Sequence, residues 1–348
     1  MLLHLTENSP EPMRSQIARQ IRGKVLSGDL AEGSELPEVH RIARAHHVSP
    51  RDVQRACETL VEEGLLVREG EAGFRVAEVS PRQRRELAQR RLFDDLREQE
   101  LSLRELELAR DIQRRLLPPA RVDGERFTVA SRSFPARFVA GDFYDVLRAA
   151  DGSVSVIVAD VAGKGFGASL IMASVKAMAP FVADGRGVAE TLCELNRRLC
   201  GELGRGQFVA AAIARLSPAA GVVELANAGM PDPFAVAHGR SVEALEVPGP
   251  RLPLGIRPDV PYASLTRRCE DGDRLLLFSD GIPEARLPSG TPLGYDAFAA
   301  ILRRATQEVR DAEEWLDGVL DEVQRATGAT LEDDWTAVVV ELRRGAEG

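Results

Sequence analysis

The feature that most constrains the fold is a long stretch between Pro81 and Pro118 that contains neither glycine nor proline. Because these two residue types are the strongest breakers of regular structure, the polar, leucine-studded stretch predicts one continuous helix over residues 82–117. Short helical patterns precede it, and alternating strand-like and helix-like runs follow it. We therefore predict three regions, which span residues 1–80, 81–118 and 119–343.

Composition and charge limit the classes of function. The chain of 348 residues has a hydrophobic fraction of 44% and a charged fraction of 28%, as ordinary globular proteins do. Its net charge of −9 argues against non-specific binding to nucleic acid or anionic lipid. No apolar run approaches the roughly 18–20 residues of a membrane span, and the first residues do not form a signal peptide. We therefore expect a cytoplasmic protein without a membrane contact.

Aspartates lie at the ends of four predicted strands in the third region. They are Asp142, Asp160 after the strand over 153–158, Asp280 after the strand over 275–278, and Asp333 before the strand over 335–342. Each motif alone is weak, because aspartate is common at turns. Together they indicate a site for Mg²⁺ or Mn²⁺, because hard cations prefer oxygen ligands, and two such ions can activate water against a phosphate ester. Four of the 5 histidines lie in the first region, so we do not expect a zinc hydrolase.

A glycine-rich motif over 163–168 offers a competing interpretation. Its pattern G-x-G-x-x-A follows a strand and precedes a helix, as in dinucleotide-binding proteins. The second strand that should end in an acidic residue is missing, because Asp184 lies between two helical runs. Neither serine nor threonine follows Lys164, so the pattern of a phosphate-binding P-loop fails too. We therefore do not expect nucleotide binding.

From Leu106 onward, the chain carries an ordered series of motifs. They are Leu108-Ala109-Arg110-Asp111-Ile112-Gln113, Leu116-Leu117-Pro118, Gly141-Asp142-Phe143-Tyr144-Asp145, Asp160-Val161-Ala162-Gly163-Lys164-Gly165, Phe208-Val209, Asn227-Ala228-Gly229, Leu252-Pro253-Leu254-Gly255, Ser279-Asp280-Gly281-Ile282 with Glu284-Ala285, and Asp333-Asp334-Trp335-Thr336. The series resembles the SpoIIE-type branch of the metal-dependent (PPM-type) bacterial serine/threonine phosphatases, over about residues 106–342. The resemblance implies an α+β fold, a two-sheet β-sandwich flanked by helices, with the metals at one edge.

The resemblance also implies a role for each aspartate. Asp160 would bridge two Mn²⁺ or Mg²⁺ ions, and Asp280 and Asp333 would complete the site of the first ion. The carbonyl of Val161 would join Asp160 at the second ion, and Asp142 would bind a metal directly or through water. Residues expected to support these ligands are Asp145, Gly281 and Asp334. A bridging hydroxide would then attack phosphorus without a phosphoenzyme.

Three positions depart from the pattern of this family. Met230 stands where the family often has histidine, Ala140 stands where a second glycine is usual, and Pro283 interrupts the motif that follows Asp280. None of these changes removes a proposed metal ligand, so we expect an active enzyme. The change at Met230 affects either protonation of the leaving group or the fit of the substrate, and the sequence does not choose between them.

The first region carries a second series of motifs. They are Val25-Leu26-Ser27-Gly28-Asp29-Leu30, Gly33-Ser34, Leu36-Pro37, Ile42-Ala43, Val48-Ser49, Val53-Gln54-Arg55-Ala56, Leu60 and Glu63-Gly64-Leu65-Leu66. This series resembles the winged helix-turn-helix domain of the GntR family, over roughly residues 10–78, and implies a mostly α-helical domain with a short β-wing. A helix predicted over 50–63 would enter the major groove, where Arg51, Gln54 and Arg55 reach base edges or phosphates.

Two questions remain open for the first two regions. The first region is net acidic and its wing carries Glu69 and Glu71, so the domain either binds DNA or serves only dimerisation or protein contact. The linker either forms a two-stranded coiled coil, and hence a homodimer, or packs as one amphipathic helix on its own catalytic domain.

The leading hypothesis is a serine/threonine phosphatase that acts on a protein. Family analogy points to a phosphorylated anti-sigma-factor antagonist as the substrate, and to regulation by the N-terminal domain through the linker helix. The alternative is a GntR-like DNA-binding transcriptional regulator whose degenerate phosphatase domain serves as a sensor. The intact set of four aspartates favours the enzyme.

Overall fold

The structure is a computed structural model that describes residues 3–6, 12–70, 73–78, 81–149, 151–217, 220–237, 241–306, 311–328 and 330–343. Its contacts divide the chain into two compact units, Met1–Leu103 and Arg104–Gly348. The first unit contains the winged helix-turn-helix domain, and the second contains a β-sandwich flanked by helices. Both fold expectations are confirmed.

Three helices and a hairpin form the first unit. They are α1 (Met13–Ser27), α2 (Val39–Ala45), α3 (Pro50–Glu62), β1 (Leu66–Glu69) and β2 (Gly73–Val76). The hydroxyl of Ser49 caps α3 by accepting a hydrogen bond from the backbone N–H of Arg51 at 3.2 Å, and Pro50 occupies the first turn. Beyond the end of α3, Gly64 has a φ of 73°, which lets the chain turn into β1. Ile42 of α2 joins the core of this unit, which is formed by fully buried side chains of α1 and α3: Ile17, Ile21, Val53 and Leu60.

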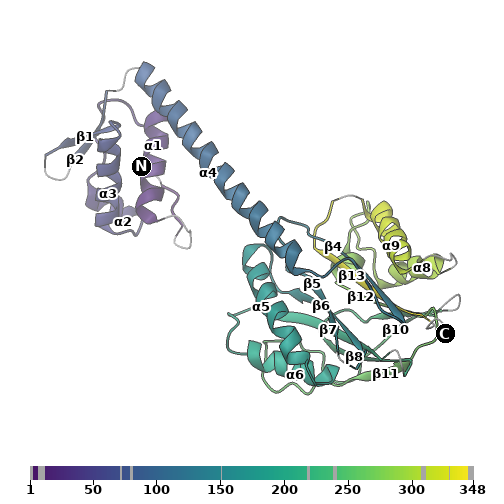
Figure 1. Ribbon diagram of the computed structural model, residues 1–348. Coiled ribbons are helices and arrows are strands. Elements are labelled where there is room, and N and C mark those ends of the chain that lie inside the picture. The colour runs from purple at the N-terminus through teal and green to yellow at the C-terminus, as the bar shows by residue number, and fades with distance from the viewer. Residues whose placement is uncertain are drawn as a thin grey trace. The chain divides into compact units, whose positions relative to one another are not determined.

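The predicted linker is one helix, α4 (Pro81–Leu116), which crosses the division between the two units (Figure 1). Near its C-terminal end, the buried side-chain amide of Gln113 donates a hydrogen bond to the carbonyl of Ala140 at 2.7 Å and accepts one from the N–H of Ala140 at 2.9 Å. This end of the linker therefore packs on its own catalytic domain. Several apolar side chains of α4 are exposed: Leu101, Leu103, Leu108, Ile112 and Leu116.

Two antiparallel sheets form the second unit. The six-stranded sheet has the order β10-β9-β12-β13-β4-β3, and the five-stranded sheet has the order β11-β8-β7-β6-β5. The strands are β3 (Arg121–Asp123), β4 (Phe127–Phe134), β5 (Phe143–Arg148), β6 (Val154–Val161), β7 (Val209–Ser217), β8 (Val222–Ala228), β9 (Phe234–Val236), β10 (Val242–Ala244), β11 (Leu265–Arg268), β12 (Arg274–Phe278) and β13 (Trp335–Leu342). Every residue of β13 is buried, because this apolar strand lies inside its sheet and is covered on both faces.

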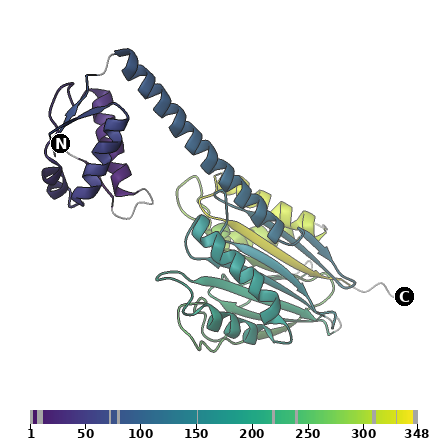
Figure 2. The same ribbon diagram turned by 60° about the vertical axis from the view of Figure 1, so that its left-hand side comes forward.

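Helices cover the outer face of each sheet (Figures 1 and 2). α5 (Phe166–Ala183) and α6 (Val188–Leu199) pack on the five-stranded sheet, where Met172 and Leu192 are fully buried. α8 (Tyr295–Ala305) and α9 (Ala312–Thr327) pack on the six-stranded sheet, where Phe298 is fully buried. A third core lies between the sheets and joins Val158 of β6 to Val338 of β13. These layers hold the strand ends in fixed positions.

One helix corrects an expectation from the sequence. By length and composition alone, α5 is long and apolar enough to cross a membrane, whereas we expected no such run. In the structure, one face of α5 lies on the five-stranded sheet, with Met172, Val175 and Ala179 buried. An apolar helix that covers a sheet meets the same compositional test as a membrane span.

Candidate active site

Antiparallel pairing brings the predicted aspartates together. Phe143 of β5 lies opposite Ala159 of β6, which places Asp142 beside Asp160. The last residue of β12 lies opposite Ala337 of β13, so the segment with Asp280 after β12 lies beside the segment with Asp333 before β13. We expected Asp160 to follow its strand, but β6 continues to Val161 because its last residues still pair with β7.

Two glycines permit the close approach of these segments. A Cβ atom at Gly281 would lie 2.2 Å from the carbonyl oxygen of Asp334, so only glycine lets the chain after Asp280 come so near the start of β13. A Cβ atom at Gly141 would lie 3.0 Å from the carbonyl oxygen of Val161. The segment before Asp142 therefore runs directly past the carbonyl that the resemblance assigns to a metal.

Burial and mutual repulsion act on three of the aspartates, whereas Asp333 is about half exposed. Burial, followed by the negative charge of Asp160, raises the pKa of Asp142 well above its ordinary value. Burial and the charge of Asp280 raise the pKa of Asp160 to about 6, although a hydrogen bond with Asp142 opposes this shift. Burial and the charge of Asp333 raise the pKa of Asp280. Each of the four carboxylates therefore lies close enough to another to influence its protonation.

This environment fits divalent cations. The carboxylate oxygen Oδ2 of Asp142 is fully buried and has no hydrogen-bond partner, which is costly unless a cation or proton satisfies it. The donors are carboxylate and carbonyl oxygens, which Mg²⁺ and Mn²⁺ prefer. In the described parts of the chain, however, no three acidic, histidine or cysteine side chains already stand as a finished ligand set. Backbone carbonyl oxygens, such as that of Val161, and water would therefore have to complete the ligand set.

Lys164 contacts one of the proposed metal ligands, and this contact was not anticipated. Its ammonium group lies 2.7 Å from Oδ2 of Asp333 and donates a second hydrogen bond to the carbonyl of Glu332 at 3.0 Å. The hydrogen bond to Asp333 raises the pKa of Lys164, so the ammonium remains charged at neutral pH. A lysine in the loop that directly follows Asp160 was the signal in the sequence, but we considered it only as part of a nucleotide-binding motif.

Asp334 organises the loop that leads to Asp142. Its two carboxylate oxygens accept hydrogen bonds from the backbone N–H groups of Ala136 at 2.7 Å and Gly141 at 2.8 Å. The same loop contains Ala140, which is held by Gln113 of α4. The position of Asp142 thus depends on contacts from the residue just before β13 and from the end of α4.

Asp145 lies in a different setting. Its Oδ2 forms an ion pair of 2.7 Å with Nζ of Lys176 on α5, and both side chains are about nine-tenths buried, with exposures of 9% and 11%. This pair fixes α5 against β5. The pairing of Lys176 was not predicted, although a single lysine within an apolar helix suggests a buried partner.

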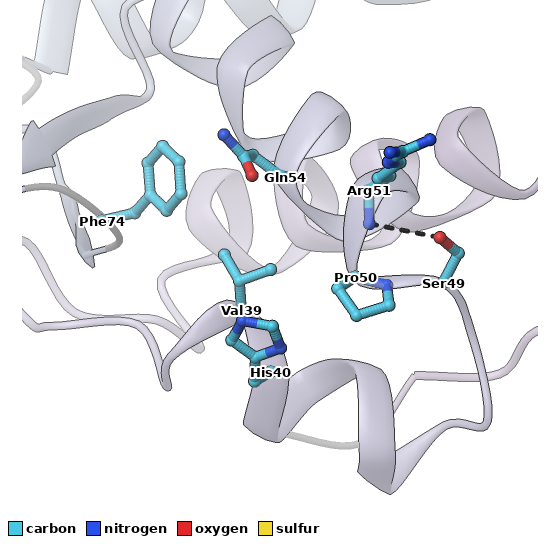
Figure 3. Close-up of a pocket in the computed structure, with 7 residues that line it drawn as sticks. All are labelled: Val39, His40, Ser49, Pro50, Arg51, Gln54 and Phe74. Carbon is cyan, nitrogen blue, oxygen red and sulfur yellow. Dashed lines mark hydrogen bonds between the residues drawn. The ribbon is translucent and has the colours of Figure 1, made fainter.

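The predicted DNA-contacting residues lie on the surface of α3. Arg51, Gln54 and Arg55 are all exposed, and Gln54 also donates a hydrogen bond to Glu58 at 3.1 Å. Arg51 and Gln54 line a cavity of about 540 Å³ between α2, the start of α3 and the wing (Figure 3). On the wing, Glu69 forms an ion pair with Arg75, which neutralises its charge. Glu71 lies outside the described residues.

Two family models match separate parts of the chain. The family model "Stage II sporulation protein E (SpoIIE)" matches residues 150–343, more than half of the chain. The chain belongs to the SpoIIE family. The matched range includes Asp160, Asp280 and Asp333. It begins after Asp142, which therefore lies outside it. A second model, "Bacterial regulatory proteins, gntR family", matches residues 13–76.

Relatives of this SpoIIE-family chain include a named enzyme and solved structures. Phosphoserine phosphatase RsbU of Bacillus subtilis is 29% identical over 244 residues, which cover 69% of this chain and 70% of RsbU. The SiaA-PP2C domain of Pseudomonas aeruginosa has a TM-score of 0.60 at 22% identity, with 71% of this chain and 97% of that chain covered. The RsbU and RsbW domains of Rv1364c from Mycobacterium tuberculosis give a TM-score of 0.57 at 23% identity, covering 64% of this chain and 61% of that chain. The two structures show the shared fold of the second unit.

Proposed function

We propose that this SpoIIE-family protein is a metal-dependent phosphatase that hydrolyses phosphoserine or phosphothreonine in a protein. The observation that carries the proposal is the meeting of Asp142, Asp160, Asp280 and Asp333 from both sheets, with an unpartnered, buried oxygen on Asp142. The kinship with RsbU, which is named a phosphoserine phosphatase, supports the same reaction.

The proposed roles are those that the family resemblance implies, and the proximity of the residues supports them. Asp160, Asp280 and Asp333 would hold one Mn²⁺ or Mg²⁺ ion, and Asp160 with the Val161 carbonyl would hold a second. Asp142 would bind an ion directly or through water. Bound divalent ions supply an activated water and neutralise charge on the phosphate.

Supporting residues set the geometry for these ligands. Asp334 orients the loop before Asp142, and Gly281 allows Asp280 to approach the start of β13. Lys164 pairs with Asp333, and its ammonium group would give way to an ion held there. Asp145 acts at a greater distance, by fixing α5 through Lys176.

We further propose that the substrate is a phosphorylated protein of the anti-sigma-factor-antagonist kind, and that the reaction takes place in the cytoplasm. The N-terminal domain would regulate the enzyme through α4, because Gln113 of α4 holds the loop that leads to Asp142.

The exposed apolar side chains of α4, among them Leu108 and Ile112, support a homodimer that forms through this helix. Light scattering of the full-length protein tests the dimer.

The experiment that tests the enzymatic proposal is hydrolysis of p-nitrophenyl phosphate by purified protein. We expect activity with Mn²⁺, loss of activity with EDTA, and no turnover by Asp160→Asn despite an unchanged circular dichroism spectrum. Activity that survives complete metal removal would reject the mechanism.

DNA binding is a second candidate function. It is supported by the match to the GntR family and by the exposed positions of Arg51, Gln54 and Arg55 on α3. If the domain binds DNA, affinity falls as salt rises and falls further in Arg51→Ala with Arg55→Ala. A lack of retardation of genomic fragments at low salt would exclude this function and leave dimerisation or protein contact.

A further inference from the structure

A cavity of about 370 Å³ lies directly beside the candidate active site. Asp280 forms part of its wall, so the cavity shares a residue with the candidate active site. Other parts of the wall come from the loop between β8 and β9, from α7 (Gly281–Glu284) and from the start of α8. The cavity thus adjoins the reaction centre, but most of its lining plays no part in the roles assigned above.

The positive charge in this cavity is already neutralised. The guanidinium group of Arg251 contacts both carboxylate oxygens of Asp232, at 3.0 and 3.1 Å, and donates to the carbonyl of Met230 at 2.8 Å. The ion pair with Asp232 offsets the charge of the guanidinium group, although some of its five N–H donors remain. Arg251 and Asp232 together therefore add no net charge to the wall.

The negative charge is in excess. Glu284 lines the cavity from α7, is exposed, and forms no ion pair within the described residues. Asp280 contributes a second carboxylate to the wall, although an ion held by Asp280 would neutralise it. The carboxylate of Glu284 is thus the acidic group that remains available to a ligand.

The remaining wall suits an aliphatic stem. Met230 and Phe234 are buried and contribute apolar surface to the wall, and Tyr295 is 46% exposed. Apolar surface in the same wall as a carboxylate and an aromatic ring complements a lysine or arginine side chain. Its methylene groups can pack while its cationic end pairs with the carboxylate and the ring.

We propose that this cavity is a substrate subsite that binds a lysine or arginine side chain close to the phosphorylated residue. The proposal rests on the proposed phosphatase function and adds a class of substrate sequence to it. It also gives Met230 a role: where the family often has histidine, this chain places an apolar side chain in the wall of the subsite.

The test uses full-length protein with Mn²⁺ and a set of phosphoserine peptides. Each peptide carries a single lysine at one of the positions flanking the phosphoserine, and its partner peptide carries glutamine at the same position. For wild type, we expect kcat/KM to be about tenfold higher for lysine at one or two positions, which corresponds to about 1.4 kcal/mol. In Glu284→Gln, this ratio should fall to about twofold or less, because the ion pair is lost.

Two further variants keep the test decisive. Tyr295→Ala should reduce the lysine preference by roughly two- to fourfold through loss of the cation–π contact. Glu202→Gln is the matched control, because Glu202 is exposed and lies outside the cavity, so it should keep the full preference. Since the readout is a ratio between two peptides, a general loss of activity in a variant does not disturb it.

The outcomes separate the two proposals. If wild type hydrolyses p-nitrophenyl phosphate with Mn²⁺ but shows no lysine preference at any position, the subsite is wrong and the phosphatase function stands. A preference that persists in Glu284→Gln, or a preference for acidic peptides, also overturns the subsite. If wild type hydrolyses neither p-nitrophenyl phosphate nor any peptide, the proposed function itself fails.

Discussion

Lys164 lies in the loop that follows Asp160, and its Nζ is 2.7 Å from Oδ2 of Asp333. This lysine holds a carboxylate that the proposed mechanism needs for a metal ion. Both side chains are about half exposed, at 45% and 50%, so solvent screens the pair and its exchange for a divalent ion costs little.

The first prediction concerns this competition. In Lys164→Met, no ammonium group pairs with the carboxylate of Asp333 or repels an incoming cation. We therefore expect Mn²⁺ to bind about two- to fivefold more tightly. Isothermal titration calorimetry of metal-stripped protein measures the change. Lys164→Arg keeps the charge and should bind like wild type. Unchanged or weaker binding by Lys164→Met would show that the lysine does not compete with the metal.

The second prediction concerns pH and the metal-stripped protein. The pKa of Asp160 is raised to about 6 in the folded state, so the folded protein binds the proton of Asp160 more tightly than the unfolded chain does. The contribution of Asp160 to the free energy of unfolding is therefore complete below the pKa of the unfolded state and is lost as pH rises through about 6. Without metal at pH 7, Asp160→Asn should therefore exceed wild type in free energy of unfolding by about 2–3 kcal/mol. The advantage should shrink toward pH 4, as urea unfolding in EDTA can show. An advantage that is independent of pH would contradict the assigned cause.

The third prediction concerns the buried ion pair of Lys176 and Asp145. Lys176→Met leaves the carboxylate of Asp145 buried without its partner, and we expect a loss of about 3–5 kcal/mol in the free energy of unfolding. The double variant Lys176→Met with Asp145→Leu should regain most of that loss. Urea unfolding followed by tryptophan fluorescence measures both. Additive losses in the double variant would show that the two side chains do not act as a pair.

The fourth prediction concerns the coupling of α4 to the active site. Gln113→Ala removes both hydrogen bonds to Ala140, which frees the loop that leads to Asp142. We expect weaker Mn²⁺ binding and a loss of activity of at least about tenfold, consistent with the removal of buried hydrogen bonds. Arg114→Ala, at an exposed neighbouring position, is the control. Wild-type activity in Gln113→Ala would remove α4 from the proposed route of regulation.

Much of the fold followed from local patterns in the sequence. The stretch after Pro81 predicted α4 because nothing in it breaks a helix, and Ser49 with Pro50 predicted the start of α3. The strand before Asp160 was predicted too short, because the alternating pattern fades at Ala159 while the ladder to β7 continues. Pairing with a distant strand is not visible in local sequence.

The candidate site was also predictable in part from local sequence. Asp142, Asp160, Asp280 and Asp333 were identified by residue type and by position at strand ends. The contacts of Lys164 and Gln113 were not, because they join residues far apart in the chain and depend on the folded arrangement of loops. The cavity beside Asp280 was likewise invisible, because its walls come from four separate segments.

The central claim is that the aspartate cluster hydrolyses phosphoserine with the help of divalent ions. Its most direct test is phosphate release from a phosphoserine peptide during a Mn²⁺ titration, for wild type, Asp280→Asn and the exposed control Asp296→Asn. We predict saturable Mn²⁺-dependent release by wild type and by Asp296→Asn, and a loss of at least about a hundredfold in Asp280→Asn. Equal release by Asp280→Asn and wild type across the titration would contradict the claim.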